Sequence, residues 1–139
     1  MDRNPRRLRD TGERGMIGVD VVDLERLRPR LRQSRWRRLA FTATETTATE
    51  GLSLDAAERR LAMTWAAKEA VVKALRTGFG PSRPPAALSI LFELQGPRVA
   101  TVFAGACSHL HAYHLSCSST AGVAVAVCQI DQHDCKVGA

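Results

Sequence analysis

The sequence predicts an α+β fold in which a mostly antiparallel sheet packs against one long helix. The helix is indicated by residues 56–78, a stretch of alanine, leucine and charged residues that favour helical structure. The sheet is indicated by the change of character after this stretch, where short apolar segments alternate with turns rich in Gly, Pro and Ser. These segments are expected to pair as Leu88–Leu94 with Arg98–Phe103 and as His111–Cys117 with Gly122–Ile130.

Length and composition are those of one globular domain. The chain has 139 residues, of which 45% are hydrophobic and 24% charged, a balance that is typical of a folded protein. We expect a flexible basic leader at 1–15, one domain at 16–130 and a C-terminal tail at 131–139. No apolar run approaches the roughly 20 residues that cross a bilayer, and the leader lacks the apolar core of a secretory signal. The expected compartment is therefore the cytoplasm, with no membrane partner.

The formal net charge of +6 indicates an anionic partner. Nucleic acid, a membrane surface, a phosphorylated small molecule and an acidic protein all qualify, and charge alone does not choose among them. The informative part of the excess is a run of arginines ahead of the long helix: Arg26, Arg28, Arg30, Arg32, Arg35, Arg37 and Arg38.

The first element after the leader is a short strand over residues 16–22, which is apolar except at Gly18 and Asp20. Asp23 is placed to cap the helix that follows, and Pro29 leaves the far boundary of that helix open. Two short helical turns come next, over 35–40 and 44–50.

The long helix carries signals at both ends. Asp55 is expected to be its N-cap, with Glu58 completing a start that resembles a capping box. Gly78 and Gly80, followed by Pro81, are expected to end it.

The four cysteines lack the CxxC spacing that indicates a metal or redox site: Cys107, Cys117, Cys128 and Cys135. Disulfides form in oxidising compartments, which nothing in the sequence indicates. We expect all four to be free thiols without a chemical role.

Two acidic residues have unusual surroundings. Asp20 lies in the middle of an apolar strand, where an unpaired carboxylate is costly, so an arginine or a metal ion should meet it. Glu69 lies four residues after Trp65 and four before Lys73, so these side chains share one helix face. A buried ion pair for Asp20 and an ordinary salt bridge between Glu69 and Lys73 are the simpler interpretations. The alanines and valines around Glu69 and Lys73 argue against a solvated face.

Two further segments could contact a ligand. Thr77, Gly78 and Gly80 follow the long helix, and their backbone N–H groups could touch a phosphate or an amide, although a helix cap explains the same residues. His114 and Ser116 lie on a strand that ends in hydroxyl residues, where a lone histidine is more often structural than catalytic.

Together these segments resemble the 4′-phosphopantetheinyl transferase superfamily in its short holo-[acyl-carrier-protein] synthase type. The matching stretches occur in the family's order: GVDVVDLERL at 18–27, FTATE at 41–45, WAAKEAVVKALRTGFG at 65–80 and HLSCSS at 114–119. The WxxKEAxxKA pattern is specific, particularly with GxDxxxxxR ahead of it. The resemblance covers residues 16–130.

The resemblance implies Mg²⁺-dependent transfer of the 4′-phosphopantetheine moiety of coenzyme A to a serine of a carrier protein, with release of 3′,5′-adenosine bisphosphate. Asp20 and Glu69 match the family's Mg²⁺ ligands, with water and pyrophosphate oxygen expected in the remaining positions. Glu69 is also a candidate to accept the seryl proton. Lys73 matches the lysine that approaches the phosphates, and His114 matches a histidine near the coenzyme. The resemblance makes both of them candidate catalytic residues beside Glu69. The remaining residues expected around the coenzyme are Thr77, Gly78, Gly80 and Ser116.

The resemblance also implies partners. Arg26 matches the family arginine that meets the acidic carrier protein, and Arg28 lies beside it. Short members assemble as homotrimers with active sites between subunits. The carrier could belong to a fatty-acid, polyketide or peptide synthase, because all three are acidic around the serine.

The sequence departs from the family pattern at two positions. Ser119 stands where a second histidine is usual, and Thr64 stands where an arginine often precedes the aromatic residue of the helix motif. The phosphate contact of that arginine is either lost or supplied by Arg59 or Arg60.

Two alternatives belong to other functional classes. A basic module that binds nucleic acid would explain the charge, but it leaves Asp20 and Glu69 unexplained, and only 5% of residues are aromatic and could stack on bases. A degenerate transferase that only docks carriers conflicts with the presence of Asp20, Glu69 and Lys73. The sequence therefore favours coenzyme A and an acidic carrier protein as partners over nucleic acid.

Overall fold

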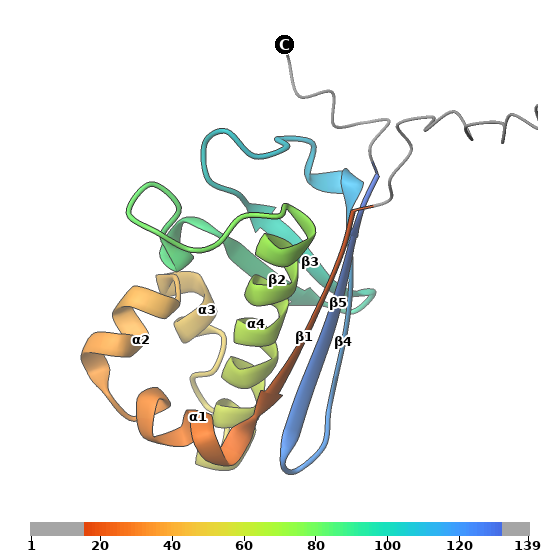
Figure 1. Ribbon diagram of the computed structural model, residues 1–139. Helices are drawn as coiled ribbons and strands as arrows, with labels where there is room; N and C mark the ends of the chain where they lie inside the picture. Colours follow the sequence, from red (N-terminus) through yellow and green to blue (C-terminus); the bar gives the residue numbers. More distant parts are fainter. Residues whose placement is uncertain (1–15, 132–139) are drawn as a thin grey trace, which may run out of the picture.

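A computed structural model describes residues 16–131 (Figure 1). The elements follow in the order β1 (Met16–Asp23), α1 (Leu24–Leu31), α2 (Ser34–Ala40), α3 (Ala43–Thr47), α4 (Leu54–Ala74), β2 (Ser89–Glu93), β3 (Gly96–Thr101), β4 (Tyr113–Ser119) and β5 (Val123–Ile130). The predicted α+β class is confirmed, and so are both predicted strand pairs. The expected leader at 1–15 lies outside the described residues, as does the expected tail apart from Asp131.

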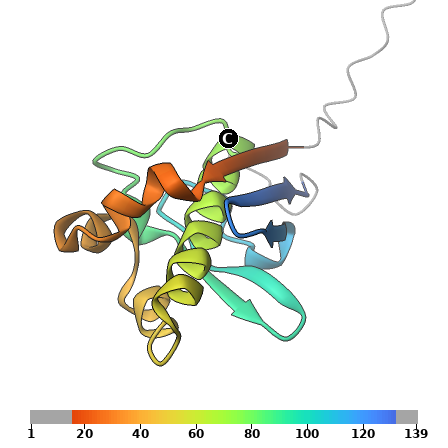
Figure 2. The same cartoon turned by 90° about the horizontal axis from the view of Figure 1, so that it is seen from below.

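Strands β1, β5 and β4 form an antiparallel sheet in that order, and β2 pairs with β3 in a separate hairpin. Helix α4 packs on one face of the three-stranded sheet, called the inner face below, and α1–α3 lie on the far side of α4 (Figure 1, Figure 2). The helix can lie close to its neighbours because many of its buried side chains are small: Ala62, Ala66, Ala67, Ala70 and Ala74. The opposite, outer face of the sheet carries no element among residues 16–131 (Figure 2).

Gly18 sets the distance between β1 and α4. A Cβ atom at this position would lie 1.9 Å from the carbonyl oxygen of Ala70 and 2.5 Å from the backbone nitrogen of Ala74. Any side chain would therefore push β1 off the helix, since both clashing atoms belong to the backbone. The contact places Asp20, two residues further along β1, beside the last turns of α4.

The N-terminal cap of α4 differs from the prediction. Ser53 is the N-cap, and its hydroxyl accepts a hydrogen bond from the N–H of Ala56 at 3.2 Å. Asp55 lies inside the first turn, where its negative charge favours the positive end of the helix dipole. The sequence pattern was wrong by two residues because Ser53 and Asp55 both suit a helix start.

The predicted glycine stop of α4 is also wrong. The helix ends at Ala74, and Arg76 adopts a left-handed conformation with φ of 56°. The N–H of Thr77 donates to the carbonyl of Val72, and the N–H of Arg76 donates to the carbonyl of Lys73, both at 3.0 Å. This is a Schellman cap closed by an arginine, and it ends the helix before Gly78 is reached.

Other expectations at the start of the chain hold. Asp23 caps α1, because its Oδ1 accepts from the N–H of Glu25 at 3.0 Å. Pro29 lies inside α1 without ending it. No helix among the described residues is long and apolar enough to cross a membrane.

The expectation of four free cysteines is wrong for Cys107, which is disulfide-bonded. Spacing along the chain does not reveal such pairing, because a disulfide depends on Cα atoms that the fold brings within about 7 Å. Cys117 and Cys128 are free, and burial raises their pKa values to about 11 and about 12. These two thiols are therefore unreactive at neutral pH. Cys135 lies outside the described residues.

Candidate active site

Asp20 and Lys73 form the centre of the candidate site. Asp20 lies on the inner face of β1, and its side chain is 13% exposed. The ammonium nitrogen of Lys73 lies 2.7 Å from Oδ1 of Asp20 and 3.1 Å from the carbonyl oxygen of Val19. The positive group that meets Asp20 in the structure is thus a lysine, where the sequence indicated an arginine or a metal ion.

Glu69 lies one turn before Lys73 on α4. Burial raises the pKa of the Glu69 carboxyl above its usual value, the negative charge of Asp20 raises that pKa further, and the ammonium of Lys73 lowers it. Asp20 and Glu69 are therefore close enough to repel one another, and a cation near both would relieve that repulsion.

The two carboxylates fit a magnesium ion better than a transition metal. Among residues 16–131, no group of three or more His, Cys, Asp or Glu side chains could hold a metal ion. Mg²⁺ prefers oxygen ligands, keeps several waters and commonly takes its other ligands from phosphates. Asp20 and Glu69 would supply two such oxygens and leave the remaining positions to water and substrate.

The loop after α4 is fixed by contacts to its own chain, yet its glycines are not needed by the fold. Phe79 stacks on Trp65 with ring centroids 5.7 Å apart, and Nε of Arg83 donates to the carbonyl of Gly78 at 3.0 Å. Neither Gly78 nor Gly80 has a positive φ, and a Cβ atom at either would meet no atom within 4 Å. The space beside both glycines leaves room for a ligand to approach the backbone closely.

His114 and Ser116 lie on the outer face of the sheet. Their side chains alternate along β4 with those of Leu115 and Cys117, which face α4. Nε2 of His114 lies 2.7 Å from Oδ2 of Asp131. Within one chain, the sheet therefore separates His114 and Ser116 from the three residues gathered on the inner side, Asp20, Glu69 and Lys73.

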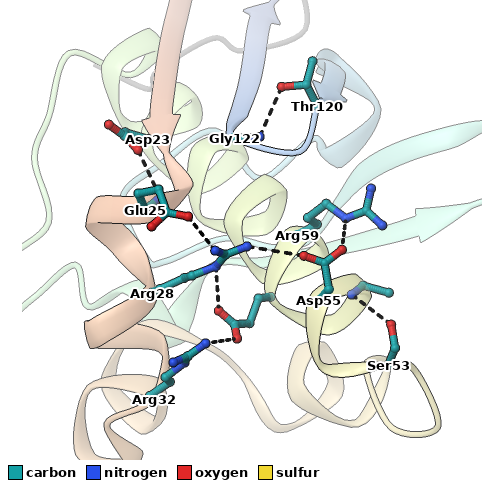
Figure 3. Close-up of polar contacts among 11 residues, drawn as sticks. Asp23, Glu25, Arg28, Arg32, Ser53, Asp55, Arg59, Thr120 and Gly122 are labelled. Carbon is teal, nitrogen blue, oxygen red and sulfur yellow. Dashed lines mark hydrogen bonds and ion pairs between the residues drawn. The ribbon is translucent and has the colours of Figure 1, made fainter.

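Arg28 is surrounded by carboxylates of its own chain (Figure 3). Its guanidinium pairs with Glu25 on α1 and with Asp55 and Glu58 on α4, and Arg32 adds a 3.0 Å bond to Glu58. These ion pairs join α1 to the first turns of α4. Arg28 therefore contributes to the fold in this structure.

Arg26 has a different environment on the same helix. Its side chain is 90% exposed, and its closest acidic contact among residues 16–131 is Oδ2 of Asp23 at 3.8 Å. An exposed pair at this distance contributes little stability. The guanidinium of Arg26 is therefore available to an acidic partner.

The sequence reasoning missed the ion pair between Lys68 and Glu45. Lys68 is fully buried, with Nζ 2.6 Å from Oε1 of Glu45, 2.8 Å from the carbonyl oxygen of Ala40 and 2.9 Å from that of Pro85. Burial lowers the pKa of Lys68, and Glu45 opposes that shift. Glu45 also closes a capping box with Thr42 at the start of α3. The T-x-x-E pattern within FTATE was a sequence signal for this capping box, but not for the ion pair with Lys68.

The residues at the Thr64 departure from the family pattern are all engaged within the chain. Thr64 is buried and donates its hydroxyl to the carbonyl of Arg60 at 2.9 Å. The guanidinium of Arg60 lies 4.7 Å from the ring centre of Phe92, and Arg59 pairs with Asp55 at 3.1 Å. A phosphate contact by Arg59 or Arg60 stays a prediction.

Comparison with protein families gives a match over residues 16–128 to the model of the 4′-phosphopantetheinyl transferase superfamily. The chain belongs to this superfamily. The matched range contains the candidate site residues on β1, α4 and β4. No curated protein matches the sequence significantly.

Solved structures resemble this superfamily member along most of its length. A holo-(acyl-carrier-protein) synthase from Bacillus anthracis, in complex with CoA (3′,5′-ADP), is 26% identical with a TM-score of 0.70, over 84% of this chain and 96% of that one. The ACPS–CoA complex of Chronobacterium ammoniagenes is 25% identical with a TM-score of 0.64, over 86% of this chain and 98% of that one. At 22% identity, the Helicobacter pylori synthase in complex with coenzyme A shows the shared fold alone, with a TM-score of 0.68 over 84% of this chain and 100% of that one.

Proposed function

We propose that this chain transfers the 4′-phosphopantetheine moiety of coenzyme A to a serine of an acyl carrier protein, with Mg²⁺, and releases 3′,5′-adenosine bisphosphate. The observation that carries the proposal is the meeting of Asp20, Glu69 and Lys73 where Gly18 lets β1 contact α4. Two carboxylates and an ammonium suit a pyrophosphate with its metal ion. Superfamily membership supports this reaction, and the coenzyme-bound relatives support coenzyme A as the donor.

The residues divide the chemistry among them. When bound at Asp20 and Glu69, Mg²⁺ would supply positive charge for the pyrophosphate oxygens. The seryl oxygen forms a bond to the β-phosphorus of coenzyme A, and the bond from that phosphorus to the bridging oxygen breaks. Glu69, or a water beside it, accepts the seryl proton. Lys73 stabilises the charge on the phosphates. In the loop at 77–80, the backbone N–H groups of Gly78 and Phe79 would face them, because those of Thr77 and Gly80 bond to the carbonyls of Val72 and Arg83.

The outer face of the sheet supports the trimer that the sequence resemblance implies. Its β1 side chains are apolar and exposed, with Ile17 at 60%, Val19 at 48% and Val21 at 63%. A monomer that left this strip in water would expose a contiguous apolar surface, so we propose a second copy of the chain as its occupant. His114 and Ser116 lie on the same face, where they could complete the coenzyme site of a neighbouring subunit.

The carrier protein would approach the arginine-rich side of the molecule. Arg26 is exposed and only weakly engaged, so it carries this part of the proposal. Arg28 would have to exchange the carboxylates that surround it before it could contact a partner. The cytoplasm, where carrier proteins and coenzyme A meet, is the compartment that this activity requires.

Mass spectrometry of apo-carrier proteins tests the proposal. Carriers from fatty-acid, polyketide and peptide synthases are incubated separately with the protein, coenzyme A and Mg²⁺. We expect at least one class to gain the mass of one phosphopantetheine, and we expect EDTA to prevent the gain. Carrier binding without any mass gain would favour the docking-only alternative and overturn the transferase.

A further inference from the structure

The ammonium of Lys73 occupies the place where a cation would neutralise Asp20. It is held there by Oδ1 of Asp20 at 2.7 Å and by the carbonyl oxygen of Val19 at 3.1 Å. Within residues 16–131, Lys73 is the one basic side chain paired with Asp20. Glu69 lies one turn away on the same helix, so the lysine offsets both carboxylates at once.

We infer that Lys73 is an internal competitor of the metal ion, whose ammonium has to leave Asp20 before Mg²⁺ can bind there. This inference rests on the proposed function and concerns how its site is filled. An ammonium and a divalent ion cannot share the same carboxylate oxygen at contact distance, because their charges repel strongly in a partly buried site. The affinity of the empty protein for Mg²⁺ is therefore low.

Lys73 is able to leave because little else holds it. Its side chain is 51% exposed, and both of its acceptors lie on β1. Lys68, on the same helix, is fully buried among acceptors from three segments and has no such freedom. The contrast identifies Lys73 as the lysine of α4 that can exchange partners.

The pyrophosphate of coenzyme A is the anion that would draw Lys73 away from Asp20. Once the ammonium contacts a phosphate, Asp20 is free to bind the metal, and the metal in turn strengthens phosphate binding. Mg²⁺ and coenzyme A should therefore bind cooperatively, and the coupling must be the same in both directions. Coupling between two ligands typically amounts to about 5- to 150-fold in affinity.

Metal binding to the full-length protein tests this inference without reference to turnover. Mn²⁺ binding is measured by electron paramagnetic resonance and Mg²⁺ binding by calorimetry, each with and without coenzyme A. In the Lys73→Met variant, we expect the metal alone to bind about tenfold more tightly than in the parent protein. Coenzyme A should raise metal affinity in the parent protein and have a much smaller effect in this variant.

Two controls separate competition from a general change of charge. Lys73→Arg keeps a cation beside Asp20 and should keep the weak metal binding of the parent protein. Arg98→Met removes one positive charge from β3, where Arg98 pairs with Glu93, and should leave metal affinity unchanged. If Lys73→Met failed to fold, Lys73→Gln would serve in its place, with thermal unfolding as the check.

The outcomes distinguish this inference from the proposed function. If Lys73→Met bound metal no more tightly than the parent protein while the parent showed Mg²⁺-dependent transfer, the competition would be overturned and the function retained. If neither protein bound Mn²⁺ or Mg²⁺, even with coenzyme A, both the metal site and the competition would be overturned. Tighter metal binding combined with roughly 100-fold slower turnover would support both, because the lysine would then oppose the metal and assist the phosphates.

Discussion

Helix α4 carries two lysines that form ion pairs of nearly equal length in opposite surroundings. Lys68 lies 2.6 Å from Glu45, with both side chains almost fully buried, and Lys73 lies 2.7 Å from Asp20, with its own side chain half exposed. Lys68 has two further carbonyl acceptors, which belong to the end of α2 and to the segment before β2. Lys73 has one further acceptor, on β1.

The two lysines of the WxxKEAxxKA pattern therefore have different roles in the molecule. A buried pair stabilises the fold only while it is complete, because removing one partner leaves an uncompensated charge in the interior. An open pair contributes little stability and can exchange partners, since water can replace either side. Lys68 therefore fixes α4 against α2, α3 and the segment before β2, while Lys73 serves a site that must receive ligands.

The largest expected effect comes from breaking the buried pair. Lys68→Met should lower the free energy of unfolding by roughly 3–5 kcal/mol, because Glu45 would remain buried without its cation. Urea unfolding followed by circular dichroism measures this change. The double variant Lys68→Met, Glu45→Gln should recover part of the loss, and a single variant within about 1 kcal/mol of the parent would contradict a buried structural pair.

Breaking the partly exposed pair between Asp20 and Lys73 should lower activity and leave stability nearly unchanged. Asp20→Ala should reduce phosphopantetheine transfer by at least about 100-fold, in line with the loss of one group that stabilises transition-state charge. Its unfolding free energy should change by less than about 1 kcal/mol, because a partly exposed ion pair adds little to stability. Turnover is measured at limiting Mg²⁺, with Glu93→Ala, which removes an exposed carboxylate from β2, as the control. Near-normal transfer by the Asp20 variant would remove this carboxylate from the site.

The parts of the site that follow from local pattern could be predicted from the sequence. The shared face of Glu69 and Lys73 depends only on helical spacing, and the misplaced charge of Asp20 depends only on its apolar neighbours. The antiparallel pairs were predictable for the same reason, because turn residues separate short apolar segments.

The parts that depend on tertiary contacts could not be predicted. Gly18 is required because Ala70 and Ala74 approach it from a helix about fifty residues further along the chain, and no local pattern encodes that approach. The burial of Lys68 likewise depends on Glu45, which lies on α3 and contacts Lys68 only in the folded chain. Side-chain identity also did not reveal that Arg28 forms ion pairs with carboxylates of its own chain while Arg26 is exposed.

A smaller effect on activity is expected at Gly78, where only backbone atoms would contact the ligand. Gly78→Ala should leave stability unchanged or raise it by up to about 1 kcal/mol, because alanine restricts the unfolded chain and meets open space in the fold. The same methyl group should raise the KM for coenzyme A several-fold if phosphates approach this loop. Gly122→Ala, at a glycine that also has open space but lies in the β4–β5 turn, is the matched control. Equal KM values for both variants would place the coenzyme elsewhere.

The smallest and most condition-dependent effect is expected at Arg26. This side chain is almost fully exposed, so its charge should act on the encounter with an acidic carrier rather than on the chemistry. Arg26→Glu should therefore raise the KM for the carrier several-fold at low salt, while the KM for coenzyme A and kcat change little. The effect should shrink as ionic strength rises, because the Debye length falls from about 30 Å at 0.01 M to about 8 Å at 0.15 M.

Arg98→Glu is the control for Arg26→Glu, because it reverses the charge of a half-exposed arginine on β3, away from α1. Steady-state kinetics at two salt concentrations, with each substrate varied in turn, separate the possibilities. Equal rises in both KM values would place Arg26 beside the coenzyme, and equal effects of the two reversals would show that only net charge matters. A selective, salt-sensitive rise for Arg26 alone would show that α1 presents an arginine to the carrier while the neighbouring Arg28 holds the helix in place.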